Sequence, residues 1–217
     1  MNTPEFEPLL AARQRTIELI DGFSQEDSDR SPKESSRLLG EAGRWSIGEI
    51  LDHVLRVQSA LGGEIEELCR LDELEEPTVL RRTCKDYDVA PGFVPRSAMP
   101  LLELGFELFN TVSRSVLPFS LRQRLLRTRS IPIKNPTKWL PEAGRTITGL
   151  REELQNSMGN LEELLKRGTK KPLEELILTH TVFGSYSVPE ILGVLEVHET
   201  WHHKDIEGLR PSVSGAG

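Results

Sequence analysis

Three of the five histidines stand close together near the end of the chain, at His198, His202 and His203. Successive residues of an α-helix are rotated by about 100°, so His198 and His202 point the same way, one turn apart. His203 should point elsewhere. Two imidazoles at this spacing can bind a single metal ion. The alternative is a pair of core histidines that hydrogen-bond to carbonyl groups or carboxylates.

The direction in which this helix face points favours metal binding over the alternative. Ile191, Leu195 and Leu209 share the 3-4 spacing of His198 and His202, so the histidines interrupt an apolar stripe that should face the core. Burying imidazoles there costs free energy unless each ring nitrogen finds a partner. Metal binding supplies such a partner.

His53 is the candidate for a third ligand. It lies beside Ile50 and Val57, on the flank of the apolar stripe of an earlier helix. Three imidazole nitrogens would leave coordination positions open for water or substrate, and such sites suit Zn²⁺, Ni²⁺ or Fe²⁺. A partly buried histidine with ordinary hydrogen bonds is the alternative.

Several other residues could assist such a site. Asp205 follows His202 by about one turn and could orient a ligand ring, and His180, in an expected turn, could approach the pocket. Glu49 is explained by helix capping, because Ser46 and Glu49 form an S-x-x-E capping box. We expect Asp52 and Glu199 to be surface charges.

A basic stretch runs from residue 108 to 141 and contains no acidic residue. Its arginines include Arg122, Arg124 and Arg127. Within an acidic protein such a stretch could hold an anionic substrate, the carboxylates of a thiol cofactor, or an acidic patch on a partner subunit. The alternative is a solvated helix face followed by a loop.

The elements that must position these residues are helices. Apolar spacing and capping signals predict long helices over 3–22, 46–71, 147–167 and 187–209, with shorter ones over 99–117 and 120–128. Residues 77–145 otherwise form an irregular insertion. We therefore expect an all-α fold, a four-helix bundle in one domain over 1–211, with a disordered tail over 212–217.

The composition excludes some functions. Of 217 residues, 37% are hydrophobic and 28% charged, and the net charge is -7, which disfavours binding to nucleic acid or to an anionic membrane. No apolar run approaches the ~20 residues that span a bilayer, and no secretory signal is recognisable. We expect a cytoplasmic protein in which Cys69 and Cys84 stay reduced.

Three segments together resemble a known family. Residues 45–53 (WSIGEILDH) resemble the pattern W-S-i-x-e-v-l-x-H of the DinB-like (YfiT-like) superfamily. Residues 179–190, with THTVFG and SVPE, are similar to its entry to the last helix, and 198–206 (HETWHHKDI) to its H-x-x-R-H-x-x-Q-I segment. Thr181, Trp201 and Asp205 replace the family's proline, arginine and glutamine. These positions surround the ligands, so they bear on the substrate more than on the metal.

The resemblance implies an up-down-down-up four-helix bundle with one divalent metal ion held by His53, His198 and His202. It also implies a metal-dependent hydrolase, or an S-transferase that uses a low-molecular-weight thiol, acting on a small electrophilic molecule, often as a homodimer. The chain contains no GxSxG motif or Ser-His-Asp pattern that would supply a protein nucleophile. The alternative is a non-enzymatic metal-binding or stress-response bundle that acts as a dimer.

Overall fold

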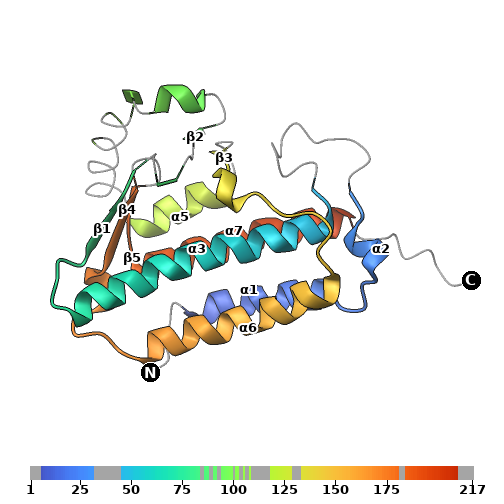
Figure 1. Ribbon diagram of the computed structural model, residues 1–217, viewed down its shortest axis with the longest axis horizontal. Coiled ribbons are helices and arrows are strands. Elements are labelled where there is room, and N and C mark those ends of the chain that lie inside the picture. Colours follow the sequence, from blue (N-terminus) through green and yellow to red (C-terminus); the bar gives the residue numbers. More distant parts are fainter. Residues whose placement is uncertain are drawn as a thin grey trace, which may run out of the picture.

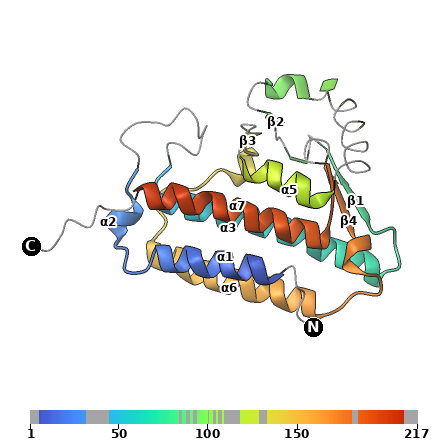
Figure 2. The ribbon, with the colours of Figure 1, turned by 180° about the vertical axis from the view of Figure 1, so that it is seen from behind.

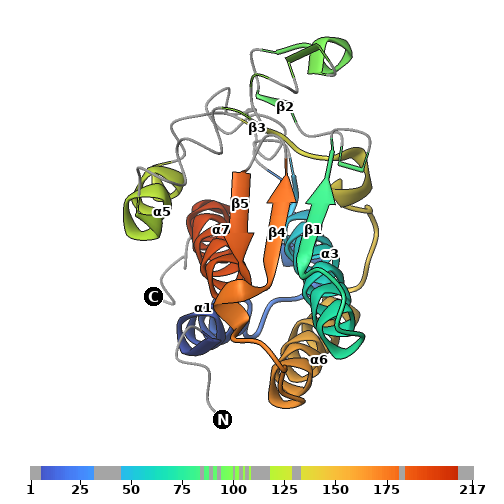
Figure 3. The same ribbon diagram turned by 90° about the vertical axis from the view of Figure 1, so that its left-hand side faces the viewer.

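Four long helices form the body of the protein. The computed structural model describes residues 6–31, 45–83, 86–87, 90–91, 94–99, 101–102, 105, 108, 118–128, 133–180 and 184–209. The long helices are α1 (Phe6–Leu19), α3 (Ile47–Glu73), α6 (Ile147–Lys166) and α7 (Val188–Leu209). They lie side by side along the molecule (Figure 1, Figure 2), and seen end on they occupy the corners of a square in which α1 contacts α6 and α7, and α3 contacts the same two helices (Figure 3).

Local sequence signals account for where these helices begin. The Ser46 side chain accepts a hydrogen bond from the Glu49 backbone N–H, and the Glu49 carboxylate accepts one from the Ser46 backbone N–H, so the predicted capping box is present. At the start of α6, the Thr146 side chain accepts a hydrogen bond from the Gly149 backbone N–H. The apolar stripe predicted for α6, with Leu150 and Leu154 among its members, is buried. The expected mostly helical fold is confirmed.

A small sheet was not expected from the sequence. Strands β1 (Val79–Arg82), β4 (Ile177–His180) and β5 (Gly184–Ser187) pair in the order β1-β4-β5, with β1 parallel to β4 and β5 antiparallel to it. The expected all-α class omits this sheet. Its central strand is a short run containing Ile177 and Thr179, and its parallel partner lies almost a hundred residues earlier, so no short-range turn signal announces the pairing.

The buried apolar residues fall into two clusters, and the histidines stand where one gives way to the other. On α3, Val54 belongs to one cluster and Val57 to the other, with His53 beside this boundary. On α7 the change occurs between Leu195 and Ile206, the interval that contains His198 and His202. The histidine rings therefore lie close to the place where the two apolar clusters meet.

The remaining described elements are short: α2 (Gln25–Ser28), β2 (Ala90–Pro91), η2 (Arg96–Ala98), α5 (Phe119–Arg127), β3 (Ile133–Lys134), η3 (Thr137–Trp139) and η4 (Leu173–Glu175). Helix α5 matches the prediction over 120–128. Most of the helix predicted over 99–117, and the tail over 212–217, lie outside the described residues. In the described part of the chain, no helix is both long and apolar enough to cross a bilayer.

Candidate metal centre

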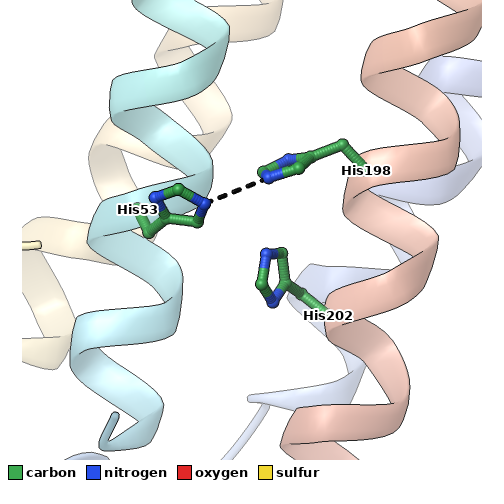
Figure 4. A group of neighbouring side chains, drawn as sticks. All are labelled: His53, His198 and His202. Atoms are coloured by element: carbon green, nitrogen blue, oxygen red, sulfur yellow. Dashed lines mark hydrogen bonds between the residues drawn. The ribbon is translucent and has the colours of Figure 1, made fainter. Parts of the chain in front are cut away.

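His53 from α3 meets His198 and His202 from α7, and the three rings face one another (Figure 4). The ring centres are 5.0 Å apart for His53 and His198, 5.3 Å for His53 and His202, and 4.8 Å for His198 and His202. One nitrogen from each ring lies within 4.8 Å of the others. The expected three-histidine group is thus assembled from the two predicted helices, and it could hold one metal ion.

The His53 ring is oriented by a backbone carbonyl. Its Nδ1 lies 2.7 Å from the carbonyl oxygen of Trp139. A carbonyl oxygen only accepts, so the proton of neutral His53 must be on Nδ1, and Nε2 keeps its lone pair. That Nε2 lies 3.1 Å from Nε2 of His198. The lone pair therefore points toward the centre of the group.

The His202 ring is oriented by a carboxylate. Its Nδ1 lies 2.9 Å from Oδ2 of Asp205, which accepts the N–H hydrogen bond. This leaves Nε2 of His202 as the nitrogen available for a metal, and the hydrogen bond to Asp205 fixes the orientation of the ring. Asp205 thus makes the hydrogen bond that the predicted orienting role requires.

The donor set fits a divalent ion. Zinc–nitrogen bonds are about 2.0–2.1 Å long, which places two nitrogens of one tetrahedral zinc site about 3.3 Å apart. The two facing Nε2 atoms, 3.1 Å apart, are close to that separation. Among the described residues no carboxylate or thiol joins the three imidazoles. Neutral imidazoles with open positions around them suit Zn²⁺, Ni²⁺ or Fe²⁺.

Asp52, beside His53 in the chain, supports the loop that carries the Trp139 carbonyl. It was expected on the surface, and this prediction is wrong because the residue is fully buried. Its carboxylate accepts hydrogen bonds from the Glu142 backbone N–H at 2.6 Å, from Arg145 at 2.7 Å and from Arg56 at 2.6 Å. Burial by itself raises the pKa of Asp52, but these hydrogen bonds outweigh it and hold the pKa below its ordinary value.

Glu199 was also expected on the surface, and this prediction is wrong because the residue is buried on the face of α7 that packs against α1. Its carboxylate pairs with Arg13 of α1 at 2.7 Å and accepts from the Thr16 hydroxyl at 2.6 Å. Arg13 also donates to Gln58 and to the Leu154 carbonyl. A signal was present in the sequence, since Arg13 and Thr16 interrupt the apolar stripe of α1 at helical spacing.

His203 points away from the histidine group, as predicted. Its Nε2 lies 3.1 Å from the Ala12 carbonyl oxygen and 3.0 Å from the Thr16 hydroxyl. Burial lowers the pKa of His203, which keeps this ring neutral over a wider pH range. His203 is therefore a half-buried histidine with ordinary partners, next in sequence to a candidate ligand.

An apolar cavity of about 130 Å³ adjoins the group at His198. It lies between the sheet and helices α3 and α7. Its aromatic walls are Tyr87, Trp139, Tyr186 and Trp201, and its aliphatic walls are Val57, Leu61, Leu178, Ile191, Val194 and Val197. His180, which sits on strand β4 and not in a turn, lines the same cavity and is buried. It is not part of the three-histidine group.

Two tryptophans pack beside the rings of the histidine group. Trp45 packs on His53 with ring centres 4.7 Å apart, and the ring centres of Trp201 and His198 are 6.1 Å apart.

On α5, Arg122 pairs with Glu190 at 2.7 Å and Arg127 with Glu196 at 2.5 Å, so these arginines join α5 to α7. Arg124 is exposed. A role of these arginines in binding a cofactor stays a prediction.

Cys69 is a buried free thiol, and Cys84 lies outside the described residues. Burial raises the pKa of Cys69 to about 11, with the nearby Glu73 adding to the effect. Since the thiolate is the reactive form, Cys69 is unreactive near neutral pH.

Comparisons with known proteins give one finding about the family. Neither the curated proteins nor the solved structures contain a match to this chain. A family model described as the DinB superfamily matches residues 9–206, which include most of α1, the histidine group and nearly all of α7. The match covers most of the chain and agrees with the helical fold and with the placement of the three histidines, so this protein belongs to the DinB superfamily.

Proposed function

We propose that this protein is a metal-dependent enzyme that hydrolyses a small electrophilic molecule or transfers a thiol to it. One observation carries the proposal: three imidazoles converge beside a cavity, and two of them are oriented by hydrogen bonds on their far nitrogens. A divalent ion bound there would act as a Lewis acid and lower the pKa of a water or thiol that it binds.

The protein's own residues orient the ligand rings and exclude water from them. The Trp139 carbonyl and Asp205 hold two rings with their Nε2 lone pairs inward, which reduces the reorganisation needed at the moment of binding. Trp45 packs on His53. Among the described residues, the cavity beside His198 is therefore the space that a substrate could occupy. The cavity favours catalysis over a purely structural ion, because structural sites are closed by a fourth protein ligand.

The two reaction classes differ in the nucleophile. In hydrolysis the oxygen of water forms the new bond to the electrophilic atom, and the leaving group departs with the bonding electrons and takes up a proton. In thiol transfer a thiolate sulfur forms that bond instead. Both are consistent with three histidine ligands and open positions.

Metal content tests the site. We expect about one equivalent of zinc, nickel or iron in the purified wild-type protein by elemental analysis, and none in His53→Ala. His203→Ala is the matched control, because His203 is a half-buried histidine next to His202 but faces α1. Equal metal content in the wild type and in His53→Ala would end the assignment.

Turnover tests the activity. The metal-loaded protein is assayed with ester and amide substrates, and with low-molecular-weight thiols together with electrophilic acceptors. We expect turnover that a chelator abolishes and that zinc, nickel or iron restores. A loaded protein that is silent in both panels would instead favour the non-enzymatic metal-binding alternative.

We also propose an up-down-down-up order of the four helices and a homodimer. The colour gradients of Figure 1 support the order, since α1 and α7 run one way and α3 and α6 the other. The homodimer rests on the resemblance to the family, and light scattering during size-exclusion chromatography tests it. A monomer at all concentrations would contradict it.

A further inference from the structure

The cavity beside His198 has walls that select for uncharged ligands. Among the described residues, its lining contains no aspartate, glutamate, lysine or arginine. Glu64 lies behind Tyr87, where its carboxylate accepts the Tyr87 hydroxyl and pairs with Arg82 at 2.7 Å. A charged group brought into this space would lose its hydration without gaining an ionic partner.

The size of the cavity limits the ligand. An apolar protein cavity of about 150 Å³ is known to bind benzene. The cavity here, about 130 Å³, is slightly smaller, and aromatic rings of Tyr87, Trp139 and Tyr186 form much of its wall. Edge and face contacts with these rings favour a flat aromatic ligand over an aliphatic one.

The walls are also firmly held. The Tyr87 ring packs against Trp139 and His180, with centres 5.3 Å and 5.4 Å away, and Tyr186 packs under Arg122 at 5.0 Å. Gly184, at the start of β5, has a φ of 88°, a value that favours glycine, and it lines the cavity without a side chain. The space is therefore a preformed feature of the sheet and of α7.

We propose, on the basis of the proposed function, that this cavity binds the uncharged part of the substrate, a group the size of one aromatic ring, against His198. The reactive end of the substrate then lies toward the histidine group. A polar, charged thiol cofactor does not fit this space, so in a thiol transfer it would approach the metal from another direction. The proposal names the substrate class, which the reaction class leaves open.

Binding of fluorobenzene, followed by ¹⁹F NMR, tests the size and charge of the ligand. We expect zinc-loaded wild-type protein to bind fluorobenzene about tenfold or more tightly than 4-fluorobenzoate and 4-fluorobenzylammonium, which carry opposite charges on the same ring. If fluorobenzene does not bind, or if either ion binds as tightly, the proposal is overturned.

Two variants locate the binding. Val194→Phe fills the cavity and should weaken fluorobenzene binding about tenfold or more, while Val79→Phe, the same change at an exposed position on β1, should leave it unchanged. Leu61→Ala enlarges the cavity and should admit 1-fluoronaphthalene. Affinities unchanged by both Val194→Phe and Leu61→Ala would show that the ligand binds elsewhere and overturn the proposal.

A paramagnetic ion tests the approach to the histidines and separates the two proposals. Co²⁺ in place of Zn²⁺ should accelerate ¹⁹F relaxation of bound fluorobenzene in the wild type, and no such effect is expected in His53→Ala. The His53→Ala variant should still bind fluorobenzene, because His53 does not line the cavity. If the wild type bound fluorobenzene but took up no metal ion, the proposed function alone would fail. If it took up Co²⁺ but the relaxation of bound fluorobenzene did not change, the cavity proposal alone would fail.

Discussion

Two buried polar clusters lie on neighbouring faces of α7, and they differ in how their polar atoms are used. Glu199 joins Arg13, Thr16 and Gln58 toward α1, which we name the Arg13–Glu199 cluster. His198, the residue before Glu199, and His202, one turn after His198, point from α7 toward α3 and His53.

The Arg13–Glu199 cluster is saturated by the protein itself. The guanidinium donates to both Glu199 oxygens, at 2.7 Å and 3.0 Å, and also to the Leu154 carbonyl and Ser157. Opposite charges, donors and acceptors are matched within the cluster. In the histidine group, by contrast, ring nitrogens face one another beside a cavity. The first arrangement stabilises the fold, and the second is suited to binding something from outside.

The largest effect should come from His198→Ala. Zinc at about 1,000 times its dissociation constant should raise the wild-type free energy of unfolding by about 4 kcal/mol, because it binds only the folded state. The variant should gain nothing and should lose metal-dependent turnover about 1,000-fold or more. Urea unfolding with and without zinc measures this. If zinc raised the free energy of unfolding of the variant as much as that of the wild type, the histidine group would not be the zinc site.

Glu199→Ala should give the opposite result. Removing one partner leaves Arg13 buried and uncompensated, so the free energy of unfolding should fall by about 3 kcal/mol. The increment on adding zinc should persist. Glu207→Ala on the exposed side of α7 is the control, with a change of about half a kcal/mol. A loss of zinc binding by folded Glu199→Ala protein would mean that the two clusters are not independent.

Asp205→Asn tests whether the hydrogen bond from His202 to Asp205 orients a metal ligand. The amide still offers a carbonyl oxygen to His202 but has no charge, and we expect zinc affinity to fall by about 10- to 100-fold. Competition with a chromogenic chelator measures the dissociation constant. Glu207→Gln serves as the control, and an unchanged affinity in Asp205→Asn would contradict the orienting role.

Asp52→Asn should have the smallest effect, and it depends on pH. Since the pKa of folded Asp52 lies below its ordinary value, the carboxylate stabilises the protein above about pH 4 and loses this effect as pH falls through the folded pKa. The variant should be less stable by about 2 kcal/mol at neutral pH, and the difference should shrink in acid. Unfolding midpoints between pH 7 and 3 measure this, with Asp21→Asn, at an exposed position, as the control. A constant difference would contradict it.

Much of the helical framework and the candidate ligands were predictable. Capping at Ser46 and the one-turn spacing of His198 and His202 depend on residues three or four positions apart, and the structure retains both features. The wrong predictions concern Asp52 and Glu199. Their partners, Arg145 and Arg13, lie 93 and 186 positions away, so periodicity within one helix could not identify them.

The sequence by itself determined the helices, the helix faces and the types of donor, because short-range hydrogen bonds and the 3.6-residue repeat act within a few residues. The tertiary structure decided which faces meet. It brought His53 to His198 across 145 positions and joined β1 to β4. It also buried Glu199 against Arg13 and left a cavity beside His198. Burial and charge pairing depend on every surface that packs together, and only the complete fold specifies those surfaces.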